Sequence, residues 1–328
     1  MNIYDIAEKA GVSIATISRV LNGNGKVHPR TKEKILKIIK ETGFVPTKNR
    51  NTSKSRTIAI VCSSFKNPTV SENVEMLSRL IEKNNFRCML SFCDSDIHDK
   101  RKTIERLVEH KVDAIIIDGI SFLDPVSDNN SYILSPVNRT PVMVINGVIN
   151  HPKAYSIICD MEDALRNLVT SYIKKGTSDI LFLFNDMWSY SINLLECFKN
   201  IYSLNNVEAD INYTHMCKDY TQLKEYLMKL DTMAMRPKLI ICSTDLLAVY
   251  CMKYFREAGI TCPNEIELIS CGGSEYVNYC TPSVSSIHGR NELMCTTAVN
   301  SLIGILNNTE VPSKTILSAE FVKKESTR

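Results

Sequence analysis

Residues 3–22 read IYDIAEKAGVSIATISRVLN, and this stretch decides how the N-terminal part of the chain folds. Apolar residues recur at helical spacing in its first half: Ile3, Ile6, Ala7 and Ala10. Asn2 is suited to cap this helix, and Asp5 lies where a negative charge favours a helix start. Gly11 ends the helix because glycine readily adopts the left-handed backbone of a C-terminal cap. Ser13 then caps a second helix over residues 14–21, which predicts a helix-turn-helix.

A third helix is expected from Pro29, which suits a first helical position, to Gly43, which ends it. Its apolar stripe consists of Ile35, Ile38 and Ile39. The second helix has a matching apolar side, made of Ile17, Val20 and Leu21. These two sides are expected to pack together with the first helix, which predicts a three-helix bundle.

The opposite face of the second helix is left outward and carries Ile14, Ala15, Ser18 and Arg19. In a recognition helix, such N-terminal side chains meet base edges in the major groove. Arg19 is suited to bind guanine O6 and N7, whereas Ile14, Ala15 and the Thr16 methyl are suited to thymine methyl groups. Phosphate contacts are predicted for hydroxyl and amide donors near the helix ends: Tyr4, Ser13, Asn22 and Thr31. The alternative is a solvated bundle that binds nothing.

The charge distribution supports the first interpretation. The formal net charge of the 328 residues is only +3. Residues 1–57 carry twelve Lys and Arg against four Asp and Glu, a net charge of +8, whereas the remainder carries −5. A basic head on a mildly acidic body predicts that the head meets a polyanion.

Residues 3–22, together with Val27, Thr31 and Gly43-Phe44-Val45-Pro46, resemble the start of regulators of the lactose/galactose repressor (LacI/GalR) family. The resemblance implies a transcriptional repressor that binds a pseudo-palindromic DNA operator as a homodimer. It implies a DNA-binding domain over residues 1–46.

Residues 47–57 read TKNRNTSKSRT and predict a basic linker. The family usually has a longer segment here, which folds on DNA into a hinge helix and inserts a leucine into the minor groove. This chain has no leucine in the stretch, so a leucine wedge is not expected. Four cations remain to contact phosphates or enter the minor groove: Lys48, Arg50, Lys54 and Arg56. The alternative is a solvated tether with only diffuse charge.

From residue 57 onward, β-rich runs alternate with helical stretches, which predicts parallel sheets covered by helices. The expected strands span residues 58–62, 87–92, 114–117, 142–145, 180–184, 239–242 and 267–270. The expected helices span residues 74–83, 101–110, 164–174, 222–230 and 246–258. About 270 residues are more than one core usually organises, so two doubly wound lobes are expected.

The body also resembles the periplasmic-binding-protein-like body of the same family. The matching residues include Asn67-Pro68, residues 112–117 and 141–145, Asp245, Ala248, Gly259, Pro263 and residues 281–284. The resemblance implies a dimer surface on this body and three crossings between the lobes, near residues 159–161, 286–288 and 316–319. Lobe 1 is then expected over about 58–160 and 288–316, and lobe 2 over about 161–287 and 317–328.

Ligands of open α/β lobes gather at the carboxyl ends of the strands. This rule places the candidate effector-binding residues in the cleft between the lobes: Ser64, Phe65, Asn146, Trp188, Asp245 and Gly272. Trp188 is the only tryptophan and is either a ligand platform or a packing residue. Asp245 either binds the effector or caps the helix that follows it.

Sugar-binding members of the family commonly place an arginine where this chain has Leu194 or Leu195, and an aspartate where it has Gly272. Charge-assisted hydrogen bonds of that kind are worth about 1.5–3 kcal/mol each. Without them, the effector is not expected to be a routine hexose. A more apolar molecule, a protein partner or no effector at all are the alternatives, and in the last two the body is an interaction or effector-independent module.

Other classes of protein are not indicated. The N-terminus lacks the pattern of a signal peptide, and no apolar run is long enough for a membrane span, so a cytoplasmic location is expected. The twelve cysteines form no C-x-x-C pair, and the six histidines form no pair at i, i+4, so neither a metal site nor a cofactor is predicted. The G-x-S-x-G motif is absent, and Asn22-Gly23-Asn24-Gly25 follows no strand, which argues against an enzyme.

Overall fold

The computed structural model describes residues 3–22, 27–42, 55–94, 96–137, 139–205 and 213–328. It falls into two compact units, Met1–Lys54 and Ser55–Arg328, which we call the head and the body. Within the described ranges, no helix is long and apolar enough to cross a membrane.

The head consists of helices α1 (Ile3–Ala10), α2 (Ile14–Asn22) and α3 (Pro29–Thr42). Gly11 adopts φ +65°, the left-handed conformation expected at the end of α1. The apolar sides of the helices form one buried cluster: Ile6, Ala7, Ala10, Ile17, Val20 and Ile35. Ile38 and Ile39 of α3 pack against this cluster. The predicted helix-turn-helix is therefore confirmed, whereas Gly43 lies outside the described residues.

Lobe 1 of the body is built on a six-stranded sheet with the order β11-β5-β4-β3-β1-β2. All its paired strands are parallel. The strands are β1 (Thr57–Cys62), β2 (Arg87–Phe92), β3 (Ala114–Asp118), β4 (Val142–Ile145), β5 (Ala154–Asp160) and β11 (Lys314–Ser318).

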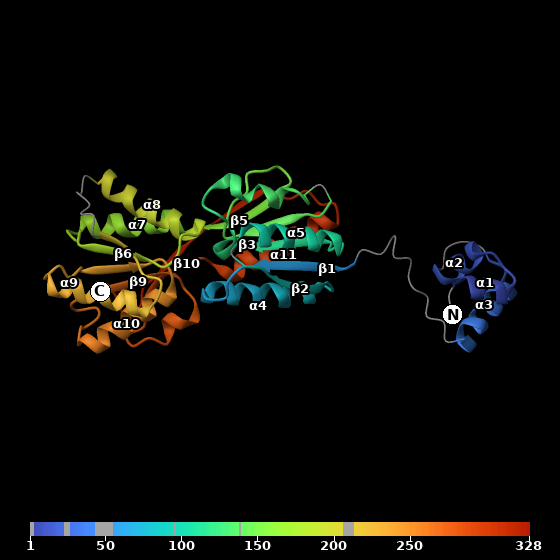
Figure 1. Cartoon of the computed structure of the whole chain (residues 1–328), viewed down its shortest axis with the longest axis horizontal. Helices are drawn as coiled ribbons and strands as arrows, with labels where there is room; N and C mark the ends of the chain where they lie inside the picture. The colour runs from blue at the N-terminus through green and yellow to red at the C-terminus, as the bar shows by residue number, and fades with distance from the viewer. Residues whose placement is uncertain (1–2, 23–26, 43–54, 95, 138, 206–212) are drawn as a thin grey trace. The chain divides into compact units, whose positions relative to one another are not determined.

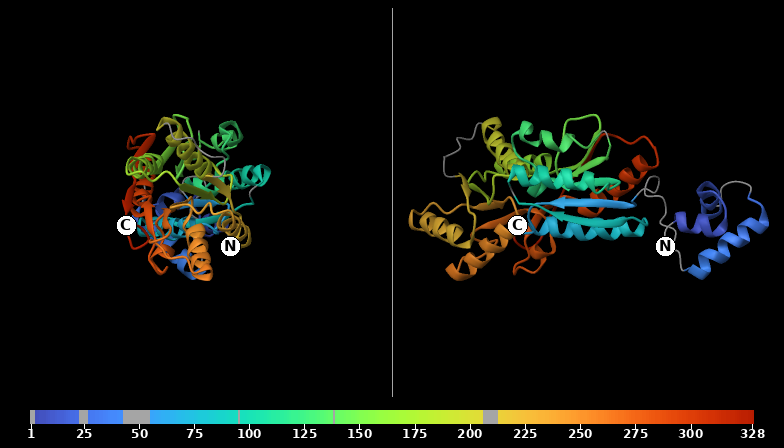
Figure 2. Two further views of the ribbon diagram at one scale, coloured as in Figure 1. Left: turned by 90° about the vertical axis from the view of Figure 1, so that its left-hand side faces the viewer. Right: turned by 45° about the vertical axis from the view of Figure 1, so that its right-hand side comes forward.

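Helices cover both faces of this sheet. They are α4 (Pro68–Lys83), α5 (Ile97–Glu109), α6 (Gly119–Phe122), the 3-10 helix η1 (Ser127–Leu134) and α11 (Asn291–Leu306). Ile58 and Ile60 of β1 face α4 and α11, whereas Ala59 and Val61 face α5 and η1. This alternation along a strand buried on both faces explains its uninterrupted apolar sequence. In the right-hand view of Figure 2, α4 runs alongside β1.

Lobe 2 has a second six-stranded sheet, with the order β12-β10-β9-β8-β6-β7. Its strands are β6 (Ile180–Phe184), β7 (Thr214–Met216), β8 (Leu239–Cys242), β9 (Glu267–Gly272), β10 (Ser285–His288) and β12 (Glu320–Val322). Only the pairing of β12 with β10 is antiparallel among the described strands.

Helices α7 (Met161–Lys174) and α8 (Ser189–Leu204) cover one face of this sheet, and α9 (Tyr220–Thr232) and α10 (Asp245–Ala258) cover the other (Figure 1). A 3-10 helix, η3 (Glu275–Asn278), follows β9. The predicted fold class, a helical head on a two-lobed α/β body, is confirmed.

The chain passes between the sheets three times: from β5 to α7, from β10 to α11 and from β11 to β12. The expected lobe boundaries after residues 287 and 316 fall inside β10 and β11, respectively. Each of these strands pairs along its whole length within one sheet, so the chain leaves lobe 2 after His288 and lobe 1 after Ser318.

The last residues of the expected linker, Ser55–Thr57, are bound to the body. The Asp113 carboxylate accepts hydrogen bonds from Ser55 Oγ (2.7 Å) and from the Thr57 backbone N–H (2.8 Å). Thr57 is the first residue of β1 and pairs with Arg87. The body thus begins at residue 55, because the side chain of Asp113 binds the chain there.

Candidate functional site: the exposed face of α2 and the inter-lobe cleft

The start of α2 is held by a side-chain cap. Ser13 Oγ accepts a hydrogen bond from the Thr16 backbone N–H at 3.3 Å and lies 3.0 Å from Thr16 Oγ1. The Val12 N–H donates to the Ala7 carbonyl at 3.1 Å, which closes the turn between α1 and α2. This turn is short because a left-handed glycine and a serine cap follow each other within three residues. The orientation of α2 relative to α1 is thereby set by local sequence.

The two sides of α2 differ in exposure, as predicted. Ile17 is fully buried and Val20 is 9% exposed, whereas Ile14 is 39% exposed. Ala15 and Arg19 are also exposed. Ser13 is exposed, and Thr16 and Thr31 are half-buried. Ile14 is not part of the buried cluster of the head.

Other predicted DNA contacts are not placed by the structure. Tyr4 lies in α1, and Ser18 and Asn22 lie in α2, but their side chains are outside the described residues, as are Lys48 and Arg50. Helix α3 adds exposed cations to the head: Arg30, Lys32, Lys34 and Lys37. These side chains were not singled out from the sequence, although the net charge of the head indicated such a surface.

In the body, Asp245 lies at the carboxyl end of β8 and is buried, with 1% exposure. Its Oδ1 accepts hydrogen bonds from Ser270 Oγ (2.6 Å) and the Gly273 N–H (3.2 Å), and its Oδ2 accepts one from the Ser274 N–H (2.7 Å). The carboxylate therefore binds the loop after β9. The suggested helix cap was wrong, because Thr244 is the N-cap residue of α10 and Asp245 is its first residue.

Positions 194, 195 and 272, which differ from the sugar-binding pattern, all lie in packed surroundings. Leu194 (1% exposed) and Leu195 (6% exposed) belong to the lobe 2 core. A Cβ atom at Gly272 would lie 2.6 Å from Asp245 Oδ2, so an aspartate does not fit there.

The candidate residues of lobe 1 lie at the carboxyl ends of β1 and β4. Ser64 is half-buried, and its Oγ accepts a hydrogen bond from the Lys66 N–H at 3.1 Å. Phe65 is 42% exposed and stacks on Phe92, with ring centroids 5.7 Å apart. Asn146 is half-buried and has φ 55°, a left-handed conformation that asparagine tolerates.

Asn146 also lines a cavity of about 290 Å³ at the crossing from β5 to α7. Acidic, amide and aromatic side chains share its wall, among them Asp160, Glu162, Tyr190 and Asn193. Burial, followed by the nearby Asp160 charge, raises the pKa of Glu162. Tyr190 packs against the cores of both lobes, and burial raises its pKa well above the usual value. The cavity thus combines charged and amide groups with an aromatic ring.

Further polar groups are buried near the carboxyl ends of the strands in both lobes. In lobe 1, Asn73 Nδ2 donates to Asp118 Oδ2 at 2.9 Å, and both residues are fully buried. Burial raises the pKa of Asp118 to about 6. In lobe 2, the buried hydroxyls of Ser243, Thr244 and Ser274 have no hydrogen-bond partner within the described part of the chain. All three residues follow strand β8 or β9.

Trp188 is covered by Lys100 of lobe 1. The Lys100 Nζ lies 4.1 Å from the centroid of the Trp188 ring and donates a 2.7 Å hydrogen bond to the Phe122 carbonyl. Lys100 is only 3% exposed. Burial lowers the pKa of Lys100 to about 8, so the amine remains largely protonated at pH 7. One face of Trp188 is therefore occupied by a cation of the protein, which favours the packing role over the ligand platform.

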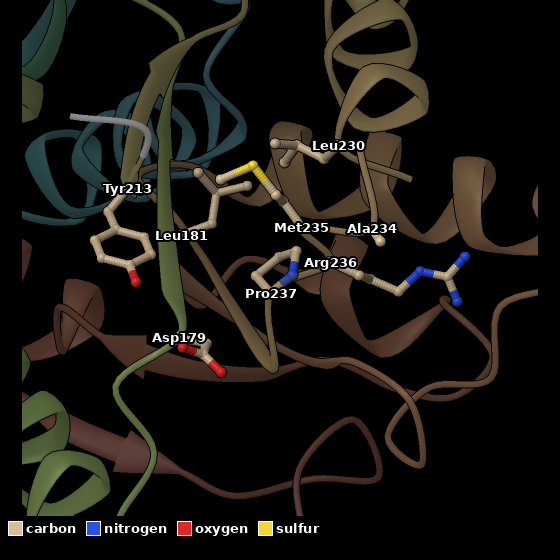
Figure 3. Close-up of a pocket in the computed structure, with 8 residues that line it drawn as sticks. All are labelled: Asp179, Leu181, Tyr213, Leu230, Ala234, Met235, Arg236 and Pro237. Carbon is tan, nitrogen blue, oxygen red and sulfur yellow. The ribbon is translucent and has the colours of Figure 1, made fainter. Parts of the chain in front are cut away.

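Another cavity, of about 230 Å³, lies at the opposite edge of lobe 2 (Figure 3). Asp179 and Pro237, which line it, precede β6 and β8, so it opens at the amino-terminal edge of the sheet. Arg236 points away from Asp179 and binds Asp231 (2.8 Å) and Glu265 (2.9 Å). Because its charged groups are paired with neighbours, this cavity is not a candidate site.

Comparison with known proteins identifies the class to which this head and body belong. Residues 2–47 match the family described as bacterial regulatory proteins, lacI family, and residues 169–327 match the periplasmic binding protein-like domain. The chain is 31% identical to an HTH-type transcriptional regulator of Lachnoclostridium phytofermentans, over 100% of this chain and 99% of that protein. The chain belongs to the lacI family and is a DNA-binding transcriptional regulator, which confirms the resemblance seen in residues 3–22.

More distant relatives agree along the whole chain. The regulator AscG of Escherichia coli is 24% identical over 99% of this chain and 97% of its own. A solved structure of the lac repressor dimer bound to operator and an anti-inducer superposes with a TM-score of 0.79 at 20% identity, over 100% of this chain and 99% of that chain. A structure of the regulator CelR with cellobiose gives a TM-score of 0.70 at 20% identity, over 99% of each chain. These likenesses show the fold.

Proposed function

We propose that the protein is a transcriptional repressor that binds a pseudo-palindromic operator as a homodimer and reads its bases with α2. One observation carries this proposal: α2 keeps Ile14, Ala15 and Arg19 at the surface while Ile17 and Val20 seal its other side. A helix with an apolar and cationic outer face is what the major groove accepts.

The roles of the individual residues follow from their chemistry. Arg19 donates two hydrogen bonds to a guanine, and Ile14, Ala15 and the Thr16 methyl contact thymine methyl groups. Phosphates are bound by Tyr4, Ser13, Asn22, Thr31, Lys48 and Arg50, which position the head without specifying sequence. Since DNA is in the cytoplasm of bacteria, the protein acts there, and its relatives by name are regulators and not enzymes.

The homodimer is supported by the edge of the lobe 1 sheet. Strand β2 exposes three large apolar side chains: Met89 (36%), Leu90 (50%) and Phe92 (57%). An exposed apolar edge strand is a liability in a monomer and is normally covered. A second copy that covers β2 would hold two heads for two half-sites about 34–36 Å apart.

For the body we propose an effector site in the cleft, with the cavity beside Asn146 and Tyr190 as its centre. Its occupant is a small molecule other than a routine hexose, because the arginine and aspartate positions are taken by Leu194, Leu195 and Gly272. A second candidate function is supported by two observations: the Asp245 carboxylate is hydrogen-bonded to the protein itself, and Lys100 lies over the Trp188 ring. In it, the body responds to a protein partner or to no effector.

These two candidates for the body are separated by thermal unfolding with a panel of sugars and nucleosides. A molecule that binds the folded state at a hundred times its Kd stabilises it by about 2.7 kcal/mol, which raises the melting temperature measurably. A uniform absence of shift across the panel would favour the partner or effector-free candidate.

DNA recognition is tested by sequencing the DNA that the purified protein retains, and then by salt-titrated binding to the site found. Arg19→Ala should weaken binding by about 1–3 kcal/mol and relax specificity at one base position. The matched control is Arg79→Ala, which removes an arginine from the exposed surface of α4. An equal loss of affinity of Arg19→Ala on random DNA would show that Arg19 does not read a base.

A further inference from the structure

The two lobes touch at both rims of the cleft. On one rim, Lys100 of α5 covers Trp188, and the Ser189 N–H donates to the Leu123 carbonyl at 3.4 Å. On the other rim, the Glu275 N–H of η3 donates to Glu72 Oε1 of α4 at 3.1 Å. Each contact joins a residue of lobe 1 to a residue of lobe 2 through protein atoms alone.

Lys100 lies in an unusual place for a cation. It is the fourth residue of α5, and the N-terminal turn of a helix repels positive charge. It is also buried, and a buried ammonium is unfavourable unless other groups compensate its charge. Both the helix dipole and the burial therefore disfavour a lysine at this position.

The compensation comes from both lobes. Lobe 1 supplies the Phe122 carbonyl at 2.7 Å and the Phe122 ring, whose centroid is 5.0 Å from Nζ. The nearby carboxylates of Asp96 and Asp124 add favourable charge. Lobe 2 supplies the Trp188 ring, whose centroid lies 4.1 Å from Nζ and is thus closer to it than the centroid of the Phe122 ring. A tryptophan face is the best aromatic partner of a cation, and the contact strengthens when water is excluded.

Trp188 is itself held in position for this contact. Its backbone N–H donates to Asp186 Oδ1 at 3.1 Å, immediately before α8 begins at Ser189. The indole is thus carried by the start of a helix that belongs to the lobe 2 core. A movement of lobe 2 away from lobe 1 carries the ring off the ammonium and exposes Lys100 to water.

We propose that Lys100 and Trp188 form an inter-lobe latch that holds the two lobes together without an effector, so that an effector or partner acts on the lobe arrangement through this contact. The latch is a property of the body alone. Only the action of an effector or partner through this contact rests on the proposed function.

The test is hydrogen exchange of the full-length protein, compared between wild type and Lys100→Met. Methionine keeps the length of the side chain and removes the charge. Loss of a desolvated cation–π contact changes an equilibrium by about tenfold or more. We therefore expect about tenfold faster exchange at the Ser189 amide and, on the opposite rim, at the Glu275 amide. Amides of β6 should not change, because the lobe 2 core stays folded.

The two rims distinguish a latch from local packing. Faster exchange at Ser189 alone would overturn the proposal, because only the immediate surroundings of Lys100 would then have loosened. Unchanged exchange at both amides would also overturn it. Lys102→Met is the matched control, since Lys102 is an exposed lysine of the same helix, and it should leave both rims unchanged.

A second variant keeps the test independent of the folding of Lys100→Met, and a second measurement follows the exposure of Trp188 itself. Trp188→Leu removes the other partner and should accelerate exchange at the same two amides. Trp188 is the only tryptophan in the sequence, so acrylamide quenching of its fluorescence reports the latch directly. The quenching constant should rise at least twofold in Lys100→Met, and an unchanged constant would contradict the proposal.

Discussion

The Asp245 carboxylate occupies the space beside Gly272 into which any larger residue would have to project. A Cβ atom at position 272 would lie 2.6 Å from Asp245 Oδ2 and 2.9 Å from its Cγ. The carboxylate cannot yield easily, because Ser270, Gly273 and Ser274 all donate hydrogen bonds to it. One buried acid thus determines which residues the loop after β9 accepts.

Gly272→Ala should therefore destabilise the body by about 1–3 kcal/mol, the range of overpacking in a tight core. Urea unfolding measures the change. The matched control is Gly304→Ala in α11, where the nearest atom to the added Cβ is at 3.4 Å. Since alanine is favoured over glycine inside a helix, the control should gain about 0.5–1 kcal/mol. In an Asp245→Ala background the penalty at position 272 should shrink, and strict additivity of the two changes would refute the steric explanation.

Asp118 should make the stability of the body depend on pH. Its pKa is raised from 3.8 to about 6 by burial. Between these values the folded state binds more protons than the unfolded state, so the free energy of unfolding should fall as the pH rises from 4 to 6. The upper limit of this fall is about 3 kcal/mol.

Asp118→Asn should remove this part of the pH dependence, which urea titrations at several pH values would reveal. Asp128→Asn, at an exposed position of η1, serves as the control and should keep the wild-type slope. If the free energy of unfolding changed with pH in the same way in Asp118→Asn and in wild type, burial of the Asp118 carboxyl would not be the cause of the pH dependence.

Leu90→Lys should separate the proposed dimer without unfolding the protomer. The side chain is half-exposed on the edge strand β2, and a lysine there opposes edge-to-edge association. Sedimentation velocity measures the result. The control is Ile316→Lys, because Ile316 is similarly exposed (54%) on β11, the other edge of the same sheet. If Ile316→Lys dissociates the dimer and Leu90→Lys does not, the dimer contact does not lie on β2.

Ile17→Ala should abolish all DNA binding by unfolding the head. Ile17 is fully buried, and changing a buried isoleucine to alanine lowers the free energy of unfolding by about 2–5 kcal/mol. This is a large part of the free energy of unfolding of a small helical bundle. The backbone amides of residues 3–22 should lose their protection from hydrogen exchange, and the affinity for random DNA should fall as well. Arg19→Ala, in contrast, should retain protected amides. Retained random-DNA binding by Ile17→Ala would argue against the head as the DNA-binding unit.

Local patterns predicted much of the fold. The strands expected over residues 87–92, 142–145, 180–184 and 239–242 are the strands observed, because each is a short apolar run between polar turns. Strand β5 was not among the expected strands, because polar residues interrupt the apolar run in its sequence, AYSIICD. In α2, the burial of Ile17 and Val20 and the exposure of Arg19 followed from helical spacing alone.

The candidate site was predicted less well, because its residues meet only in the folded chain. Thr244 and Asp245 follow β8, and Gly272 follows Ser270 in β9. These strands are parallel neighbours, with Cys242 opposite Ser270, so the loops after them lie together. Nothing local to Asp245 indicates that its partners are 25 to 29 residues away. Lys100 is a similar case, because a lysine in a polar helical stretch gives no sign of its burial.

The amino-acid sequence by itself determined the helix-turn-helix, the succession of strands and helices, and the basic head, since each depends on residues a few positions apart. Only the tertiary structure decided that Asp245 bonds the protein itself, that Gly272 admits no side chain and that Lys100 covers Trp188. The physical reason is that charge compensation and steric fit depend on which distant segments the sheets bring side by side.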